Sequence, residues 1–230
     1  MKRLVIVRHG ESEWNQKNLF TGWVDVELSD KGRAEAKRAG QALRAAGIDF
    51  DICFTSYLRR AINTQQIILK EMDREWLPVY KSFKLNERHY GALSGLNKKE
   101  TAAKYGDEQV HIWRRSFDVR PPKMEDDNPY NSQKNPAYRD VPAQEVPMCE
   151  SLKDTIARTV PYFEKEIKPL VMAGKRVMIA AHGNSLRSLI KYFEHISDEE
   201  IINVEIPTGT PLVYEFDDDF NVVKKYYLDK

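Results

Sequence analysis

Cysteine is scarce in this chain of 230 residues, and its two copies, Cys53 and Cys149, lie far apart. Two isolated thiols supply neither a disulfide framework nor a cage of metal ligands, so we expect free thiols in a reducing compartment. No apolar run approaches the roughly 20 residues that a membrane-crossing helix needs. The apolar run 4–7 stops at Arg8 and is too short for the core of a signal peptide. These absences predict a cytoplasmic protein with no membrane partner.

An excess of charge of one sign is also missing. The 36 Lys and Arg residues balance 35 Asp and Glu residues, and the formal net charge is +1. Without a global basic field we expect no nucleic-acid partner, and any recognition of anions must be local. No glycine-rich loop ends in Gly-Lys-Ser/Thr, and no GxGxxG motif follows a strand. The acidic run 217–219 falls in a predicted turn away from every histidine, so we expect no bound metal.

The order of apolar patterns along the chain predicts an α/β fold. Runs rich in β-branched residues and runs with apolar residues at helical spacing alternate. The predicted strands are 3–7, 51–55, 176–181, 212–216 and 222–227, the last two as a hairpin or edge pair. The predicted helices are 29–46, 59–73, 151–171 and 184–193. We therefore expect a single domain over residues 1–230, with a mainly parallel central sheet flanked by helices on both faces.

Proline is concentrated in one part of the sequence. Segment 121–147 holds six of the eleven prolines and few apolar residues. A segment of this composition cannot form a core of its own, so we expect a long proline-rich insertion loop laid over the domain. Residues 228–230 are expected to form a short flexible tail.

Two predicted strands end in the same pair of residues, His-Gly. His9 follows the first strand and His182 follows strand 176–181, and Gly10 and Gly183 would let the backbone approach an anion closely. In open α/β sheets, ligands bind beyond the carboxyl ends of the strands. If the two strands are neighbours, both imidazoles face one crevice. A single histidine at a strand end is more often structural, but two of them, one preceded by Arg8, indicate a site.

Hydrogen-bonding and cationic groups are dense around these strand ends. After the first histidine come Glu11, Ser12, Asn15, Asn18, Thr21 and Gly22, and Arg60 opens helix 59–73. Arg88, Lys98, Arg114 and Arg115 offer more positive charge than one phosphate requires, although each alone could be an ordinary solvated charge. Together they indicate a substrate with a second anionic group. Phosphoryl transfer with no metal would depend on such Arg, Lys and His side chains.

Arg8-His9-Gly10-Glu11 is the signature of the histidine phosphatase superfamily, and residues 3–225 resemble the cofactor-dependent phosphoglycerate mutases within it. The blocks that carry the resemblance are 8–15, 20–23, 55–61, 87–91, 93–98 and 182–185. The four-residue signature alone points only to the superfamily. The blocks at Glu87 and Lys98, with the proline-rich segment after Arg115, resemble a mutase rather than a small phosphatase.

The resemblance implies a role for each matched residue. His9 would be the phosphorylated nucleophile, Glu87 the proton donor and acceptor, and His182, with Arg8 and Arg60, would stabilise the transferring phosphoryl group. Substrate binding is implied for Arg8, His9, Gly10, Glu11, Ser12, Glu13, Trp14, Asn15, Thr21, Gly22, Arg60, Glu87, Arg88, His89, Tyr90, Lys98, Arg114, Arg115, Gly183 and Asn184.

The resemblance also implies a reaction and its components. The protein would be an isomerase of glycolysis and gluconeogenesis that interconverts 2-phosphoglycerate and 3-phosphoglycerate. The implied cofactor is 2,3-bisphosphoglycerate as the priming phosphoryl donor, with no metal. The partners would be small phosphoglycerates, and the assembly a homodimer or a homotetramer.

Two other functions are compatible with much of the same pattern. A phosphatase of the same superfamily would share His9, Arg8, Arg60 and His182, and would differ in releasing phosphate to water. A catalytically silent scaffold on the same fold is disfavoured, because such a protein needs neither the nucleophile nor its arginine, and both are present here.

Overall fold

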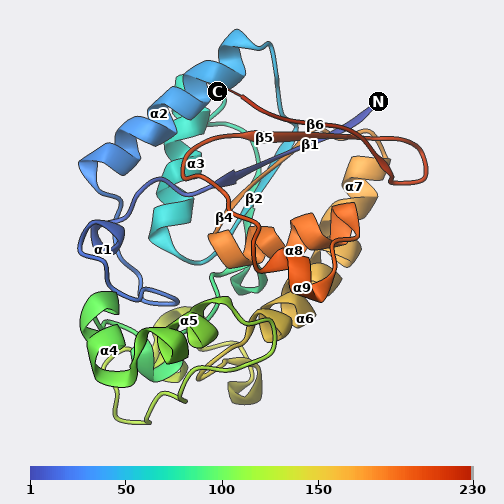
Figure 1. The fold of residues 1–230 in the computed structure, drawn as a ribbon. Helices are drawn as coiled ribbons and strands as arrows, with labels where there is room; N and C mark the ends of the chain where they lie inside the picture. The colour runs from blue at the N-terminus through green and yellow to red at the C-terminus, as the bar shows by residue number, and fades with distance from the viewer. Residues whose placement is uncertain (229–230) are drawn as a thin grey trace.

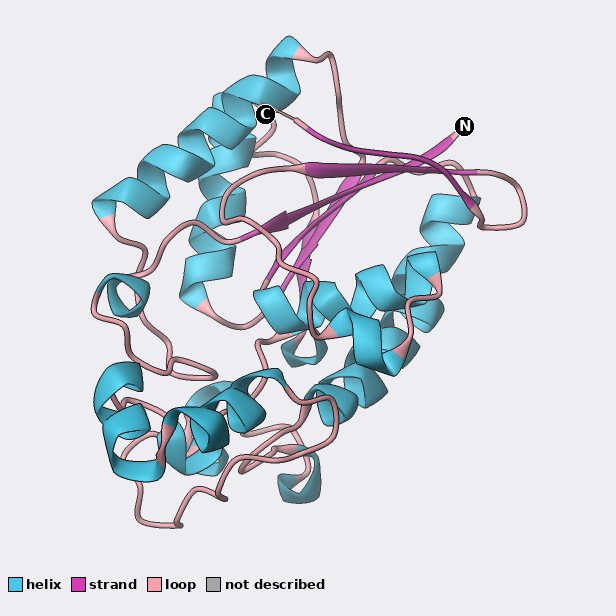
Figure 2. Cartoon of the chain, viewed as in Figure 1, coloured by secondary structure: helices cyan, strands magenta, loops and turns pink. Residues whose placement is uncertain are grey.

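A mixed sheet of six strands forms the centre of the protein in the computed structural model, which describes residues 1–228 (Figures 1 and 2). The strands, in the order in which they lie side by side, are β3 (Val79–Lys81), β2 (Ile52–Thr55), β4 (Val177–Ala181), β1 (Lys2–Arg8), β5 (Leu212–Phe216) and β6 (Val222–Tyr227). Pairing is parallel from β3 to β1 and antiparallel from β1 through β6. The predicted parallel arrangement therefore covers only the first four strands, because the terminal hairpin adds an antiparallel edge.

The two central strands are buried on both faces, as their continuous apolar sequences predict. Along β1, Leu4 and Ile6 belong to one hydrophobic cluster, while Val5 and Val7 belong to another on the opposite face. This alternation follows from the two-residue period of a strand. The sheet therefore separates two cores, and each is covered by helices.

Helices cover both faces of the sheet (Figure 1). On one face α2 (Asp30–Ala45) and α3 (Arg59–Glu71) pack against each other, and on the other lie α6 (Leu152–Tyr162), α7 (Lys168–Met172) and α8 (Gly183–Glu194). Ser29 caps α2 by accepting a hydrogen bond from the amide of Gly32. The single helix predicted over 151–171 is divided by a π-helical turn, Phe163–Ile167.

Four short helices were not among the elements predicted as helices. They are α1 (Glu13–Gln16), α4 (Lys98–Tyr105), α5 (Asp107–Arg115) and α9 (Asp198–Ile201). In Figure 1, α4 and α5 lie together below the sheet, away from the terminal hairpin. Five 3₁₀ turns complete the described chain: η1 (Phe83–Leu85), η2 (Gly91–Leu93), η3 (Ser132–Lys134), η4 (Pro136–Tyr138) and η5 (Ala143–Glu145).

The proline-rich segment 121–147 contains only 3₁₀ turns as regular structure. It is nevertheless attached to the domain, because Tyr138 is buried and stacks on Trp23 with ring centroids 5.0 Å apart. The hydroxyl of Tyr138 also accepts a hydrogen bond of 2.8 Å from the side chain of Asn86.

The end of the described chain is attached to the hairpin, because the amide of Leu228 donates to the carbonyl of Pro211. The other residues of the predicted tail, 229–230, lie outside the described residues. Within residues 1–228, no helix has the length and apolar character needed to span a bilayer.

Candidate active site

The sheet places His9 and His182 side by side. Strands β1 and β4 are parallel neighbours, and their register pairs Arg8 with Ala181, the residues just before the two histidines. The amide of His9 donates to the carbonyl of Ala181 over 3.0 Å. The two imidazole rings lie 5.1 Å apart between centroids, with an angle of 55° between their planes. The two rings thus meet at the carboxyl ends of adjacent strands, as the shared His-Gly pattern predicts.

The ring of His9 is buried, with a residue exposure of 3%. Its Nδ1 lies 2.6 Å from the carbonyl oxygen of Gly10. Because a carbonyl oxygen only accepts hydrogen bonds, Nδ1 carries the proton and Nε2 keeps its lone pair. Burial, followed by the charges of Arg60 and Arg8, holds the pKa of His9 well below its usual value. The ring is therefore neutral and can act as a nucleophile at neutral pH.

His182 is buried and neutral for similar reasons. Its Nε2 lies 2.8 Å from the hydroxyl oxygen of Ser56, which follows strand β2. Burial lowers the pKa of His182 far below its usual value, and Arg60 and His9 lower it further. Both rings are therefore neutral in the folded protein.

Two arginines, the buried Arg60 and the half-buried Arg8, supply the positive charge nearest these rings. Arg60 donates to the backbone carbonyls of Gly22 and Val24, and burial lowers its pKa to about 10, which leaves it charged at neutral pH. Arg8 donates through Nη1 to the carbonyl of Ile206, but its buried Nε has no hydrogen-bond partner among the described residues. A charged donor left without a partner is costly unless a ligand satisfies it, so Arg8 fits an anion-binding role.

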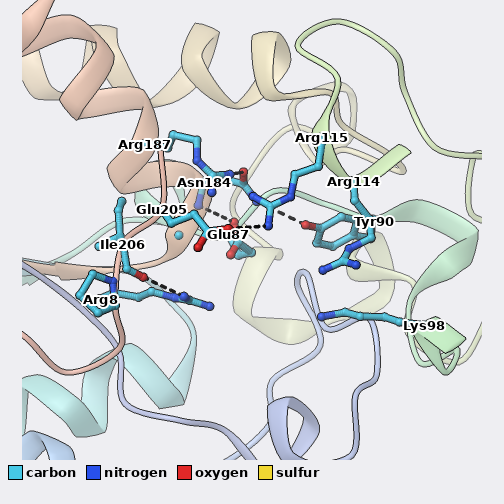
Figure 3. Close-up of a pocket in the computed structure, with 12 residues that line it drawn as sticks. Arg8, Glu87, Tyr90, Lys98, Arg114, Arg115, Asn184, Arg187, Glu205 and Ile206 are labelled. Carbon is cyan, nitrogen blue, oxygen red and sulfur yellow. Dashed lines mark hydrogen bonds and ion pairs between the residues drawn. The ribbon is translucent and has the colours of Figure 1, made fainter. Parts of the chain in front are cut away.

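A cavity of about 520 Å³ opens beside these groups (Figure 3). Five cationic side chains and two carboxylates contribute to its wall. Arg8 and Lys98 point toward each other from opposite sides. The lining residues are Arg8, Glu87, Tyr90, Lys98, Arg114, Arg115, Gly183, Asn184, Arg187, Glu205, Ile206 and Pro207. The excess of positive charge fits a small ligand with more than one anionic group.

Glu87 contributes a carboxyl group at the wall of this cavity. Its Oε1 accepts hydrogen bonds from the backbone amides of Arg88, over 2.7 Å, and Asn184, over 3.1 Å. The other oxygen, Oε2, would lie 3.7 Å from a Cβ atom built on Gly183, which also lines the cavity. One oxygen is thus fixed by backbone amides, and the other is available to a ligand.

Lys98 reaches the cavity from the start of α4. Burial, together with the nearby positive charges of Arg114 and Arg8, lowers its pKa to about 8. A lysine ammonium of this pKa is still mostly protonated at neutral pH. A bound anion would raise this pKa and keep the ammonium charged, whereas alkaline pH would remove its proton.

Several predicted site residues do not line the cavity, and their contacts are with the protein. Gly10 donates its amide to Thr64, and a Cβ atom at this position would lie 2.2 Å from the carbonyl oxygen of Gly32. Ser12 and Asn15 form a capping box at the start of α1. The predicted residues absent from the lining are His9, Gly10, Glu11, Ser12, Glu13, Trp14, Asn15, Thr21, Gly22, Arg60, Arg88, His89 and His182.

Arg88 and His89 bind backbone rather than facing the cavity. The guanidinium of Arg88 donates to the carbonyls of Trp113, Val119 and Glu150 and so holds the end of α5, where the cavity cations lie. His89 accepts the amide of Gly91 at Nδ1, and burial lowers its pKa to about 3. Substrate binding by these two residues remains a prediction.

Four lining residues were not predicted from the sequence: Arg187, Glu205, Ile206 and Pro207. Arg187 lies three residues after Asn184 on α8, and its Nη1 donates to the side-chain oxygen of Asn184 over 2.7 Å. This spacing puts both side chains on one face of a helix and would have been a usable signal. Glu205 pairs with Arg115 at 3.2 Å, a contact between distant segments that leaves no local pattern.

No group of three or more His, Cys, Asp or Glu side chains within residues 1–228 is arranged to hold a metal ion. In the acidic run 217–219, the carboxylate of Asp217 accepts the backbone amides of Asp219 and Asn221. This carboxylate stabilises the turn between β5 and β6.

Comparison with known proteins gives a consistent picture. The model of the histidine phosphatase superfamily (branch 1) matches residues 4–229. A protein of Treponema denticola named 2,3-bisphosphoglycerate-dependent phosphoglycerate mutase is 64% identical over 226 residues, which cover 98% of this chain and 92% of the relative. A Treponema pallidum protein of the same name is 56% identical over 230 residues, with the same two coverages.

Solved structures support the fold. A mycobacterial glucosyl-3-phosphoglycerate phosphatase has a TM-score of 0.72 at 21% identity, covering 100% of this chain and 98% of its own. A putative alpha-ribazole-5'-P phosphatase from Escherichia coli has a TM-score of 0.73 at 18% identity, with the same two coverages. At such identities the likeness concerns the fold alone. On the superfamily match and the two relatives, the chain belongs to the histidine phosphatase superfamily (branch 1) and, within it, to the 2,3-bisphosphoglycerate-dependent phosphoglycerate mutases.

Proposed function

We propose that the protein interconverts 2-phosphoglycerate and 3-phosphoglycerate by carrying a phosphoryl group on His9. The observation that carries this proposal is a neutral histidine, paired with a second one, beside a cavity walled by five cations. The names of the Treponema relatives supply the substrate class.

Nucleophilic attack would come from Nε2 of His9. This nitrogen keeps its lone pair because Nδ1 donates to Gly10, so no base is needed to activate the ring. Arg8, Arg60 and His182 would stabilise the charge on the transferring phosphoryl oxygens, a task that phosphoryl-transfer enzymes accomplish chiefly by positioning and electrostatics. The unpartnered Nε of Arg8 is the donor best prepared for it.

Glu87 would move the proton of the substrate hydroxyl. A hydroxyl that attacks phosphohistidine must lose its proton, and an alkoxide that leaves must gain one, so one carboxyl group serves both directions. Proton transfer of this kind accelerates a reaction by roughly 100- to 10,000-fold. The fixed Oε1 and the available Oε2 of Glu87 suit this role.

The remaining cations would hold the parts of the substrate that do not react. Lys98, Arg114, Arg115 and Arg187 lie in the wall of the cavity, and Arg88 would act through the backbone that carries Arg114. The same wall fits 2,3-bisphosphoglycerate, which carries two phosphates and a carboxylate and supplies the phosphoryl group that primes the enzyme. Gly10, Glu11, Ser12, Glu13, Trp14, Asn15, Thr21, Gly22, His89, Tyr90, Gly183 and Asn184 complete the proposed substrate-binding set.

Segment 121–147 would keep water from the phosphohistidine, which is what separates a mutase from a phosphatase. Its Tyr138 packs on Trp23, and the indole of Trp23 donates to the carbonyl of Glu87. This contact connects the segment to the proton-transferring residue. For the assembly we propose a homodimer or homotetramer, because Tyr80, on the edge strand β3, and Trp76, shortly before this strand, are large exposed aromatic residues.

A coupled assay that converts 3-phosphoglycerate to 2-phosphoglycerate tests the function. It is run in chelator, with and without 2,3-bisphosphoglycerate, on the parent and on His9→Ala. We expect turnover that requires the primer, resists the chelator and disappears with the acid-labile phosphoryl label in His9→Ala. Release of inorganic phosphate faster than isomerisation would favour a phosphatase, and turnover by His9→Ala would refute the covalent route.

A further inference from the structure

The segment that carries Glu87 has no helix or strand of its own. It lies between η1, which ends at Leu85, and η2, which begins at Gly91. A catalytic carboxyl group must be held within about 0.5 Å of its productive position by the contacts around it. The backbone of this segment therefore needs an external support, and the structure provides one from helix α6.

Arg158, on α6, binds two carbonyl groups of this segment and one of the preceding turn η1. Its Nη1 donates to the carbonyls of Lys84, over 2.9 Å, and Asn86, over 3.0 Å. Its Nη2 donates to the carbonyl of Glu87 itself, over 2.8 Å. The side chain is only 9% exposed, and it does not line the cavity. One buried guanidinium thus holds the backbone carbonyls of residues 84, 86 and 87 by hydrogen bonds.

Glu150 orients this guanidinium and extends the support. Its two carboxylate oxygens accept from Nε and Nη2 of Arg158, at 2.8 and 2.9 Å, in a two-point pairing. The same carboxylate accepts the amide of His89, and the amide of Glu150 donates to the carbonyl of His89. Before Glu87 in the chain, the carbonyl of Asn86 is bound to Arg158. After it, His89 is bound to Glu150.

Trp23 completes the arrangement. The centre of the guanidinium of Arg158 lies 5.5 Å from the centroid of its ring, and the indole N–H donates to the carbonyl of Glu87 over 2.5 Å. That carbonyl accepts two hydrogen bonds, so it cannot rotate away unless both are lost. This fixes the backbone from which the Glu87 carboxyl group projects into the cavity.

We propose that Arg158 and Glu150 are positioning residues for the reaction and set the placement of the Glu87 carboxyl group through its backbone. The inference rests on the proposed role of Glu87 in proton transfer. A misplacement of about 1 Å costs on the order of 100-fold in rate. Lysine cannot substitute, because it lacks the planar fork of five donors that reaches three carbonyls and a carboxylate together.

The first test is Arg158→Lys, which keeps the charge beside Glu150 and loses the fork. We expect kcat for phosphoglycerate to fall by about 10- to 100-fold while KM changes by less than about threefold, because the cavity cations are untouched. The matched control is Arg120→Lys. Arg120 is exposed and forms an ion pair with Asp154, which is also on α6, so this variant should retain the parent kinetics. If Arg158→Lys does not fold, Glu150→Gln with Arg158→Met removes both buried charges together, a replacement that proteins often tolerate.

The second readout is the rate at which His9 is phosphorylated by a donor whose leaving group needs no proton. An aryl phosphate with an acidic phenol needs no proton from Glu87 when His9 takes its phosphoryl group. Phosphorylation of His9 by such a donor, followed by labelling, should therefore remain within about threefold of the parent in Arg158→Lys. A general loss of structure would lower both rates equally, and that result would overturn the inference.

A double-mutant cycle with Glu87→Gln separates the inference from the function on which it rests. Full mutase turnover by Glu87→Gln would refute the role of Glu87. A loss in Glu87→Gln without any loss in folded Arg158→Lys would refute only the positioning role. We expect Arg158→Lys to cause no more than about a threefold further loss when Gln already occupies position 87, because coupled residues are not additive. Full additivity would overturn the inference.

Discussion

Nδ1 of His9 lies 2.6 Å from the carbonyl oxygen of Gly10, and this contact leaves Nε2 as the ring nitrogen with a lone pair. We therefore expect the phosphoryl group on Nε2 alone. Phosphorus–nitrogen couplings in the NMR spectrum of the phosphoenzyme, with ¹⁵N-labelled histidine, distinguish the two nitrogens. A phosphoryl group on Nδ1 would mean that the ring turns over before it reacts.

Two glycines that follow the histidines should respond differently to a methyl group. At Gly183 a Cβ atom would lie 3.6 Å from Nε of Arg8 and 3.7 Å from Oε2 of Glu87, an ordinary contact inside the cavity. Gly183→Ala should keep or slightly raise stability, by up to about 1 kcal/mol, and lower kcat/KM by roughly tenfold or more. Thermal unfolding and steady-state kinetics measure both.

Gly10→Ala is the matched comparison, because the new Cβ would lie 2.2 Å from the carbonyl oxygen of Gly32. Backbone must move to relieve this contact, so we expect a loss of roughly 1–3 kcal/mol in the free energy of unfolding. Equal stability of the two variants would contradict the packing described for Gly10.

Lys98 should make substrate binding weaken at alkaline pH. Its pKa is lowered to about 8, so its positive charge is present below pH 8 and is lost as the pH rises through that value. We expect KM to rise by up to about tenfold per pH unit above 8. In Lys98→Arg, whose guanidinium stays charged over this range, the rise should be much smaller. The same alkaline rise in both variants would assign it to another group.

Three buried histidines should destabilise the fold at acid pH. The pKa values of His9, His182 and His89 are all lowered, so below the unfolded value of about 6.5 only the unfolded chain takes up their protons. Well above pH 6.5 the three rings are neutral in the folded and the unfolded chain, and they add no pH dependence to stability. As the pH falls to 5, protonation of the unfolded chain should lower the free energy of unfolding by about 2 kcal/mol for each histidine. Urea unfolding at pH 7, 6 and 5 measures this loss.

A pair of variants checks the cause of the acid loss. His89→Asn should reduce the loss of stability by about one third. His111→Asn, at an exposed histidine, should leave it unchanged. A free energy of unfolding that stays constant from pH 7 to pH 5 would mean that the three rings can be protonated in the folded protein.

The long elements are predictable because their own sequences bury one face or both. The apolar runs of β1 and β4 and the helical spacing in α2 and α3 each specify an element without outside help. The elements that were missed are short or exposed. All three residues of β3 are exposed, so no alternation marks it, and α1 spans four residues behind a capping box.

In the site, too, the residues marked by a local sequence pattern are predictable, and those placed by tertiary contacts are not. The two histidines are found from the sequence because each ends an apolar strand. Glu205 is not, because the loop that contains it and Ile206 reaches the cavity through a tertiary contact with Arg8. Arg187 was missed although its three-residue spacing from Asn184 on α8 was a usable signal. The support of Glu87 by Arg158 joins segments more than 70 positions apart and leaves no local pattern.

The register of β1 against β4 limits where the chain can accept insertions and deletions. Removing Val5 from β1 would shift the end of the strand by about 3.3 Å and turn each later side chain of the strand to the opposite face of the sheet. His9 would then no longer stand beside His182, and Ile6 and Val7 would each turn toward the opposite core. Tolerated insertions and deletions should therefore be confined to the connections, while the lengths of these two strands stay constant.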